Sequence, residues 1–292
     1  MSGAGSSVGE LVTLARRSFQ NAGVADAALE ARLLVGGLLG LSTTEMITGE
    51  DRIVADADAF RIRDAITRRL AHEPVFRILG RRPFHGLDLK VTPATLDPRP
   101  DTEILVDRVL IHLERIIAER GSARVLDLGT GTGAIGLALA KACPQVRAVL
   151  TDISGEALSI AEENAYMNHI GDQVTLLRSD WFDQVSGTFD IIVSNPPYIV
   201  REVIGSLDPE VRDFDPMTAL DGGADGLDAY RAIAVGAPDH LNEGGLVALE
   251  IGYDQCDSVS ALFEAHGFRR IEASRDLAGN DRVLIFAVGA EG

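Results

Sequence analysis

The turn at residues 195–198 carries the side chains best suited to holding a planar amino group. It consists of Asn195, Pro196, Pro197 and Tyr198. The apolar run before it, at 189–194, predicts a buried β-strand. The two prolines end that strand and remove N–H donors, so the turn offers mainly oxygen acceptors. We expect Asn195 and the Pro196 carbonyl to accept two amide hydrogens, with Tyr198 over the amide plane.

A glycine-rich turn follows another expected strand, at 123–128. Its residues are Gly129, Thr130, Gly131, Thr132 and Gly133. Glycine adopts positive φ readily and lets a ligand approach the backbone closely. Asp152 ends the next apolar run, about 20 residues further on, where a carboxylate can accept hydrogen bonds from ribose hydroxyls. This arrangement predicts a bound nucleoside cofactor.

Two kinds of cofactor are compatible with the glycine turn. Residues 131–136 match the dinucleotide pattern G-x-G-x-x-G, so a nicotinamide-dependent oxidoreductase is one alternative. S-adenosylmethionine is favoured because Asp127, just before the glycines, would attract a cationic amino-acid group and repel a pyrophosphate. Asp180 and Trp181 follow the third expected strand, where they could bind the adenine amino group and cover its ring.

These residues are positioned by alternating strand and helix patterns, which predict an α/β fold: a mostly parallel, Rossmann-like, seven-stranded sheet with helices on both faces. The expected strands are 123–128, 147–151, 173–178, 188–194, 245–251, 268–273 and 282–288. The expected helices are 101–119, 133–142, 154–168, 226–241 and 254–266. Residues 200–225 show few periodic signals.

The chain before residue 101 has a different pattern. Apolar residues at helical spacing within 8–80 predict a small N-terminal helical domain at 1–80. Alternating residues and prolines then predict a β-hairpin linker at 81–100. The catalytic domain is expected at 101–292, because all the motifs described above lie there.

The composition indicates which classes of partner the protein can bind and in which compartment it is expected. The net charge of the 292 residues is −17; residues 1–98 hold 12 basic and 12 acidic residues, and the remainder holds 15 and 32. A strongly acidic catalytic half argues against direct nucleic-acid binding, which needs a basic surface. Neither a signal peptide nor an apolar run of about 20 residues is visible, so we expect a cytoplasmic protein without membrane contact. Neither cysteine and none of the six histidines has metal-ligand spacing, so no metal is expected.

The chain resembles the HemK/PrmC-type peptide chain release factor (glutamine-N5) methyltransferases. The segments that carry the resemblance are 97–103, 127–136, 179–182, 194–199 and 276–283. The turn at 195–198 alone is shared with methyltransferases that act on adenine. Together with the N-terminal helical domain, these segments are more specific, and the resemblance covers nearly the whole chain.

The resemblance implies S-adenosylmethionine-dependent methylation of a release factor on the glutamine of a Gly-Gly-Gln tripeptide. It implies that residues 129–133, Asp152, Trp181 and Asn195 contact the cofactor and that residues 195–198 hold the glutamine. We expect the helical domain to recognise the protein substrate. The alternatives are an adenine-N6 nucleic-acid methyltransferase, a nicotinamide oxidoreductase, and a cofactor-bound docking protein without catalytic activity.

Overall fold

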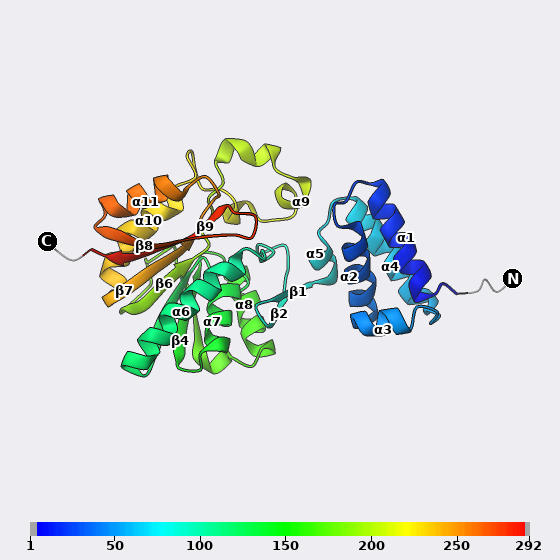
Figure 1. Ribbon diagram of the computed structural model, residues 1–292, viewed down its shortest axis with the longest axis horizontal. Coiled ribbons are helices and arrows are strands. Elements are labelled where there is room, and N and C mark those ends of the chain that lie inside the picture. The colour runs from blue at the N-terminus through cyan, green and yellow to red at the C-terminus, as the bar shows by residue number, and fades with distance from the viewer. Residues whose placement is uncertain (1–4, 290–292) are drawn as a thin grey trace. The chain divides into compact units, whose positions relative to one another are not determined.

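The computed structural model describes residues 5–289 and divides them into two compact units (Figure 1). The helical unit runs from residue 5 to Arg81 and also takes in Pro209–Phe214. The sheet unit comprises Arg82–Asp208 and residues 215–289. Every residue predicted to bind cofactor or substrate lies in the sheet unit.

The helical patterns within 8–80 are confirmed as a bundle of helices in the helical unit. They are α1 (Val8–Asn21), α2 (Ala27–Leu39), α3 (Thr43–Thr48), α4 (Asp56–Leu70) and α5 (Val75–Leu79), and α9 (Pro209–Arg212) joins them. Ser7 caps α1 in a reciprocal capping box with Glu10, which satisfies two backbone N–H groups at the helix start. The apolar faces meet in a separate core around Phe19, Leu34 and Ile62.

The hairpin expected in the linker is present but short. It consists of β1 (Arg81–Phe84) and β2 (Leu87–Lys90), which form a two-stranded sheet of their own. His85 and Gly86 make the two-residue turn, and both have positive φ, as such tight hairpin turns require. The chain from residue 91 to 101 is extended or turned before the next helix begins.

The seven expected strands are confirmed, and they form one mixed sheet in the order β5-β4-β3-β6-β7-β9-β8. Neighbouring strands from β5 to β7 pair in parallel, whereas β9 pairs antiparallel with both β7 and β8. The strands are β3 (Ala123–Leu128), β4 (Val146–Asp152), β5 (Val174–Arg178), β6 (Phe189–Ser194), β7 (Leu241–Glu250), β8 (Phe268–Arg275) and β9 (Asp281–Val288).

Helices cover both faces of this sheet, as the alternating pattern predicted (Figure 1). They are α6 (Thr102–Arg120), α7 (Ala134–Ala142) and α8 (Gly155–Met167) on one face, and α10 (Asp228–Gly236) and α11 (Cys256–Ala265) on the other. Short 3-10 segments complete the unit: η1 (Gly171–Gln173), η2 (Arg201–Ser206), η3 (Met217–Ala219) and η4 (Ala237–His240).

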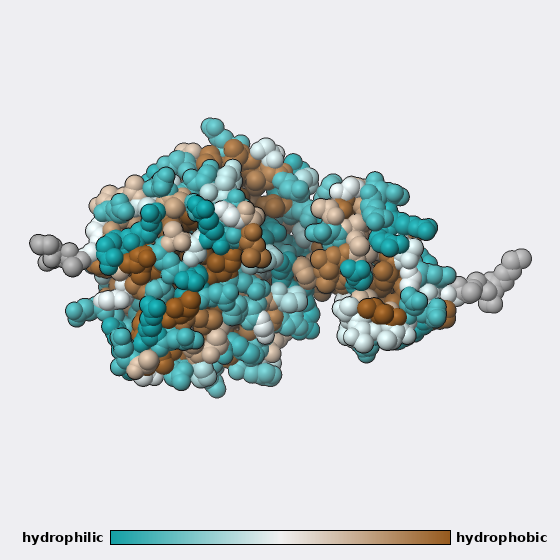
Figure 2. Space-filling model, viewed as in Figure 1, coloured by the Kyte–Doolittle hydropathy of each residue, from teal (hydrophilic) through white to brown (hydrophobic). Residues whose placement is uncertain are grey.

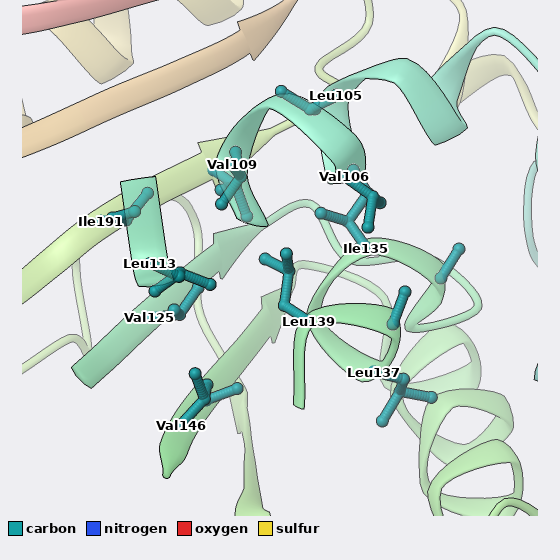
Figure 3. Close-up of a cluster of buried hydrophobic side chains, with 14 of the residues drawn as sticks. Leu105, Val106, Val109, Leu113, Val125, Ile135, Leu137, Leu139, Val146 and Ile191 are labelled. Carbon is teal, nitrogen blue, oxygen red and sulfur yellow. The ribbon is translucent and has the colours of Figure 1, made fainter. Parts of the chain in front are cut away.

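The cores on the two faces fix β3 and β6 rigidly between helices. On one face, Val125 and Ile191 pack against Leu105, Val109 and Leu113 of α6 (Figure 3). On the other face, residues of β6 and β7 pack against Tyr230 and Phe263, which are fully buried. Because all six residues of β6 are buried, its carboxyl end is held in a defined place.

The surface in Figure 2 mixes polar residues with scattered apolar ones, as is usual for proteins in water. Exposed apolar side chains include Tyr166, Tyr253 and Leu277. Within residues 5–289, every helix is too short or too polar to meet the requirements of a membrane crossing.

Candidate active site

The register of the parallel strands brings the predicted site residues to one edge of the sheet. Leu128 at the end of β3 pairs with Thr151 on one side and with Ser194 on the other. The next residues along the three strands are therefore Gly129, Asp152 and Asn195. This edge is the carboxyl end of the strands, where the strand order reverses between β3 and β6 and where α/β sheets bind ligands.

The glycine turn leaves β3 through backbone conformations that favour glycine. Gly129 and Gly131 have φ values of 67° and 55°, and a Cβ built on either would meet only open space. The turn is tied to the next strand by a hydrogen bond from Thr130 N to Thr151 O of 2.8 Å. The backbone of the turn is thus held open for the close approach of a ligand.

Asp127 lies beneath the glycine turn and not in the wall of the cavity described below. Its Oδ2 accepts hydrogen bonds from Thr130 Oγ1 at 2.6 Å and from Gly136 N at 2.9 Å. Burial raises the pKa of Asp127 to about 7, against the opposing effect of these two hydrogen bonds. Its Oδ1 is buried and has no hydrogen-bond partner among residues 5–289. Direct contact between Asp127 and the cofactor stays a prediction.

Asp152 occupies the predicted place at the end of β4. Its Oδ2 accepts from Gly131 N and its Oδ1 from Ser154 N, both at 2.9 Å. Burial raises its pKa, and the backbone hydrogen bonds from Ser154 and Gly131 lower it. The carboxylate therefore fastens the glycine turn to the edge of β4, and each oxygen keeps acceptor capacity for a ligand.

A cavity of about 420 Å³ opens at this edge, within the range of small-molecule sites. Most of the predicted cofactor residues line it: Gly129, Thr130, Gly131, Thr132, Asp152, Asp180, Trp181 and Asn195. Gly133, the last residue of the glycine turn, is the N-cap residue of α7 and has a φ of 84°. The wall of this cavity thus brings together residues from Gly129 to Asn195, which lie 66 positions apart in the sequence.

The segment after β5 has an unusual backbone. Trp181 has φ of 44°, a left-handed conformation that non-glycine residues rarely adopt. Ser179 stabilises it, because its Oγ donates to Trp181 O at 2.9 Å and accepts from Gln184 N at 3.0 Å. Such strain is typical of functional sites, and here it accompanies a tryptophan that lines the cavity.

Some residues of the turn at 195–198 line the cavity, and the others pack into the interior. Asn195 and Pro197 line the cavity, whereas Pro196 is buried and Tyr198 packs against the α10/α11 core. Burial raises the pKa of the Tyr198 hydroxyl to about 12, so it remains protonated. Stacking of Tyr198 on a substrate amide therefore stays a prediction, while the place of Asn195 in the cavity wall is observed.

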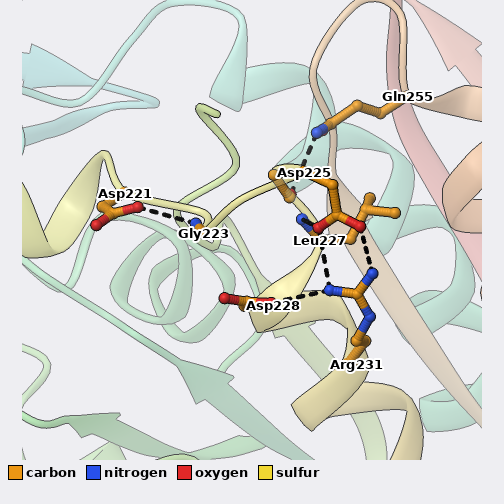
Figure 4. Close-up of polar contacts among 8 residues, drawn as sticks. Asp221, Gly223, Asp225, Leu227, Asp228, Arg231 and Gln255 are labelled. Carbon is orange, nitrogen blue, oxygen red and sulfur yellow. Dashed lines mark hydrogen bonds and ion pairs between the residues drawn. The ribbon is translucent and has the colours of Figure 1, made fainter. Parts of the chain in front are cut away.

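Side chains beyond the turn fix its backbone, and Figure 4 shows the contacts that hold the neighbouring segment at 221–231. Gln255 Nε2 donates to Tyr198 O at 3.0 Å and to Gly226 O at 3.2 Å. Ile199 makes backbone hydrogen bonds in both directions with the segment at 220–222. Asp225 and Asp228 in turn form ion pairs with Arg231 of α10. The turn is therefore braced from the side away from the cavity.

Several cavity residues were not predicted as site residues from the sequence. They are residues 94–96, Pro98 and Thr102 from the linker and the start of α6, and residues 216–219 and Asp221 from the poorly patterned stretch. Arg99 and Asp215 join the two stretches through an ion pair of 2.6 Å. The prolines near residue 98 did indicate an extended chain, but its place at the cavity depends on long-range contacts with Asp215, to which Asp97 N also donates at 3.4 Å.

The residues present fit S-adenosylmethionine. Its α-amino group is cationic, and the buried Asp127 Oδ1 is an acceptor without a partner in the described part of the chain. The carboxylate of Asp152 suits a ribose, and Trp181 suits an adenine ring. Residues 5–289 contain no group of three or more His, Cys, Asp or Glu side chains arranged to hold a metal ion.

Comparison with protein families identifies two matching regions. Residues 105–205 match the methyltransferase small domain, and residues 10–80 match the PrmC N-terminal domain. A solved methyltransferase structure from Pyrococcus furiosus has a TM-score of 0.50 at 24% identity, covering 70% of this chain and 90% of its own. That likeness supports the fold alone.

Two curated relatives match at much higher identity. The release factor glutamine methyltransferase of Agrobacterium fabrum is 51% identical over 98% of this chain and 99% of its own length. The protein of the same name from Caulobacter vibrioides is 40% identical, over 94% and 93%. Both matches extend through the helical unit as well as the sheet unit.

Proposed function

This chain belongs to the release factor glutamine methyltransferase family, and from that premise we propose how its cavity performs the reaction. The enzyme transfers a methyl group from S-adenosylmethionine to the side-chain nitrogen, N5, of the glutamine in a Gly-Gly-Gln tripeptide of a release factor. The observation that carries the proposal is the place of Asn195. It lies in the wall of the same cavity as the glycine turn and Asp152.

Cofactor binding falls to residues of β3, β4 and the segment after β5. The glycine turn at 129–133 would bring backbone close to the cofactor's amino-acid part, with Asp127 beneath it. Asp152 would accept from the ribose hydroxyls, and Asp180 and Trp181 would bind the adenine. Once bound, S-adenosylmethionine supplies an activated methyl group on a sulfonium sulfur.

The protein's part in the chemistry is to present a poor nucleophile correctly. A carboxamide nitrogen is weakly nucleophilic because its lone pair is delocalised into the carbonyl. The Asn195 Oδ1 and the Pro196 carbonyl accept its two hydrogens, which directs the nitrogen toward the methyl group. These acceptors also favour the positive charge that develops on the nitrogen. The methylated nitrogen is strongly acidic, so it releases its proton to water without a strong base.

Replacing Asn195 with alanine tests this assignment. We expect turnover to fall about 100-fold or more, because a preorganised polar contact to the reacting group is lost. Cofactor affinity, measured by calorimetry, should change much less. Asn242→Ala is the matched control, since Asn242 bonds Asp190 near the opposite edge of the sheet. Near-normal turnover of Asn195→Ala on saturating release factor would overturn the assignment.

The alternatives receive less support. The family matches are to methyltransferases and offer nothing for a nicotinamide oxidoreductase or a non-catalytic docking protein. An adenine-N6 activity shares the turn at 195–198, but the sheet-unit half of the chain is strongly acidic. We place the enzyme in the cytoplasm, because its proposed substrate is a release factor.

We assign substrate recognition to the helical domain at 1–80, joined through the linker at 81–100 to the methyltransferase domain at 101–292. A three-residue target offers few contacts, so a specific enzyme needs a second surface for the rest of the protein substrate. The match of residues 10–80 to the PrmC N-terminal domain supports this assignment.

A further inference from the structure

A buried carboxylate stands beside Asn195, and the reaction described above makes no use of it. Ser194, the last residue of β6, pairs with Leu249 of β7. The next residues on these parallel strands, Asn195 and Glu250, are therefore neighbours on the same face of the sheet. Glu250 is 2% exposed and is absent from the residues that line the cavity. It lies behind Asn195 as seen from the substrate.

A threonine links the two side chains. Asn195 Nδ2 donates to Thr102 Oγ1 at 3.2 Å, from the first turn of α6. Hydrogen bonds from Thr102 and from Asn195 favour the ionised form of Glu250. A hydroxyl that accepts from Asn195 has its own proton to donate, and the nearby acceptor is Glu250, whose buried Oε2 has no hydrogen-bond partner among residues 5–289. Donation to it would give the order amide to hydroxyl to carboxylate.

This order settles which end of the Asn195 amide points away from the cavity. A side-chain amide has a donor end and an acceptor end of nearly equal size, so its orientation follows from its hydrogen-bond partners. With Nδ2 bonded to Thr102, Oδ1 is left for the substrate. The reverse orientation would direct an NH2 group at the substrate NH2 group, which cannot be bonded that way.

We propose that Glu250 is a positioning residue for methyl transfer, which acts through Thr102 to hold the Asn195 amide with its oxygen toward the substrate nitrogen. The inference rests on the proposed function, because it concerns the acceptor in that reaction. Glu250 does not touch the substrate.

The ionisation of Glu250 gives the proposal a second observable. Burial raises its pKa to about 7, while hydrogen bonding from Thr102 and the charge of Arg282 lower it and the charge of Asp101 raises it. The other titratable groups that face it are the Tyr198 hydroxyl and Tyr230, whose Oη donates to the Glu250 backbone oxygen at 3.0 Å. A protonated Glu250 is a poorer acceptor, so turnover should fall as the pH drops through about 7.

The test compares kcat and its pH dependence for the full chain and for Glu250→Gln, with S-adenosylmethionine and a Gly-Gly-Gln peptide. We expect kcat to fall about 10- to 100-fold, since misplacing a positioning group has effects of this size. The KM of the cofactor should stay within about twofold, and the acidic limb near pH 7 should shrink in the kcat profile to what the buried Asp127, whose pKa is also about 7, contributes. A merely structural role would leave that limb in place.

Three further variants keep the outcome decisive. Thr102→Val removes the hydroxyl and should reproduce the loss of kcat with Glu250 itself still in place, whereas Thr102→Ser should retain most activity. Asp190→Asn is the matched control, because Asp190 is a buried carboxylate on β6 that bonds Arg120 and the Arg124 backbone, far from the cavity. It should keep the wild-type pH profile.

Wild-type kcat and an intact acidic limb in Glu250→Gln would overturn the proposal. If Glu250→Gln fails to fold, wild-type kcat in Thr102→Val would overturn it equally. Failure of the proposed function is a distinct result, because the unaltered chain would then methylate neither the peptide nor a release factor.

Discussion

At the scale of single residues, carboxylates fix the backbone around the site and can still accept hydrogen bonds from a ligand. Asp152 is the clearest example: both of its oxygens already accept backbone N–H groups, one of them from the glycine turn. It therefore shapes the turn, and we expect the same oxygens to accept hydrogen bonds from a ribose. Its partial burial makes each such hydrogen bond stronger than it would be in water.

Replacing Asp152 with alanine should weaken cofactor binding by about 10- to 100-fold, the size expected for losing a hydrogen bond to a charged group. Isothermal titration calorimetry with S-adenosylmethionine measures this directly. Asp172→Ala is the control, since Asp172 is an exposed carboxylate in η1. Unchanged affinity in the Asp152 variant would contradict its ribose role.

At the scale of elements, the strands that carry the site could be predicted from the sequence for a physical reason. β3 and β6 are covered by helices on both faces, so they appear as mostly apolar runs that end at the site. β7 was predicted at 245–251 but begins at Leu241, because Asn242, Glu243 and Gly244 give no apolar signal. The predicted helix at 226–241 is correspondingly divided into α10 and η4.

The positions of the loops that complete the cavity could not be predicted from the sequence. Residues 94–98 and 216–219 are linked through Asp215, which pairs with Arg99 and accepts from the Asp97 backbone, more than a hundred positions away in sequence. The stretch at 200–225 lacks periodicity because it forms short turns, η2, α9 and η3. Asp127 is a different case. The sequence indicates that it lies just before the glycine turn, but only the structure shows that its side chain lies beneath the turn.

At the scale of the whole molecule, chemistry and recognition are assigned to different units. All the residues that line the cavity belong to the sheet unit. The helical unit has its own core and supplies none of them. A division of this kind suits an enzyme whose substrate is a folded protein with a very short target sequence.

Removing residues 1–80 should therefore lower kcat/KM for an intact release factor at least tenfold, while leaving kcat/KM for a short Gly-Gly-Gln peptide within about threefold. The reason is that only the intact protein can use a second contact surface. The measurement is a methyl-transfer assay with both substrates, and cofactor affinity reports whether the shortened chain is folded. Equal rates of the full and shortened chains on the intact protein would argue against a docking role.

The central claim is that this cavity methylates the side-chain nitrogen of one glutamine. Its most direct test is mass spectrometry of a purified release factor after incubation with the full chain and S-adenosylmethionine. We predict a gain of one methyl group, located by fragmentation on the glutamine of the Gly-Gly-Gln tripeptide and absent when Asn195→Ala replaces the enzyme at the same short incubation time. A release factor that gains no methyl group, or gains it on another residue, would contradict the account.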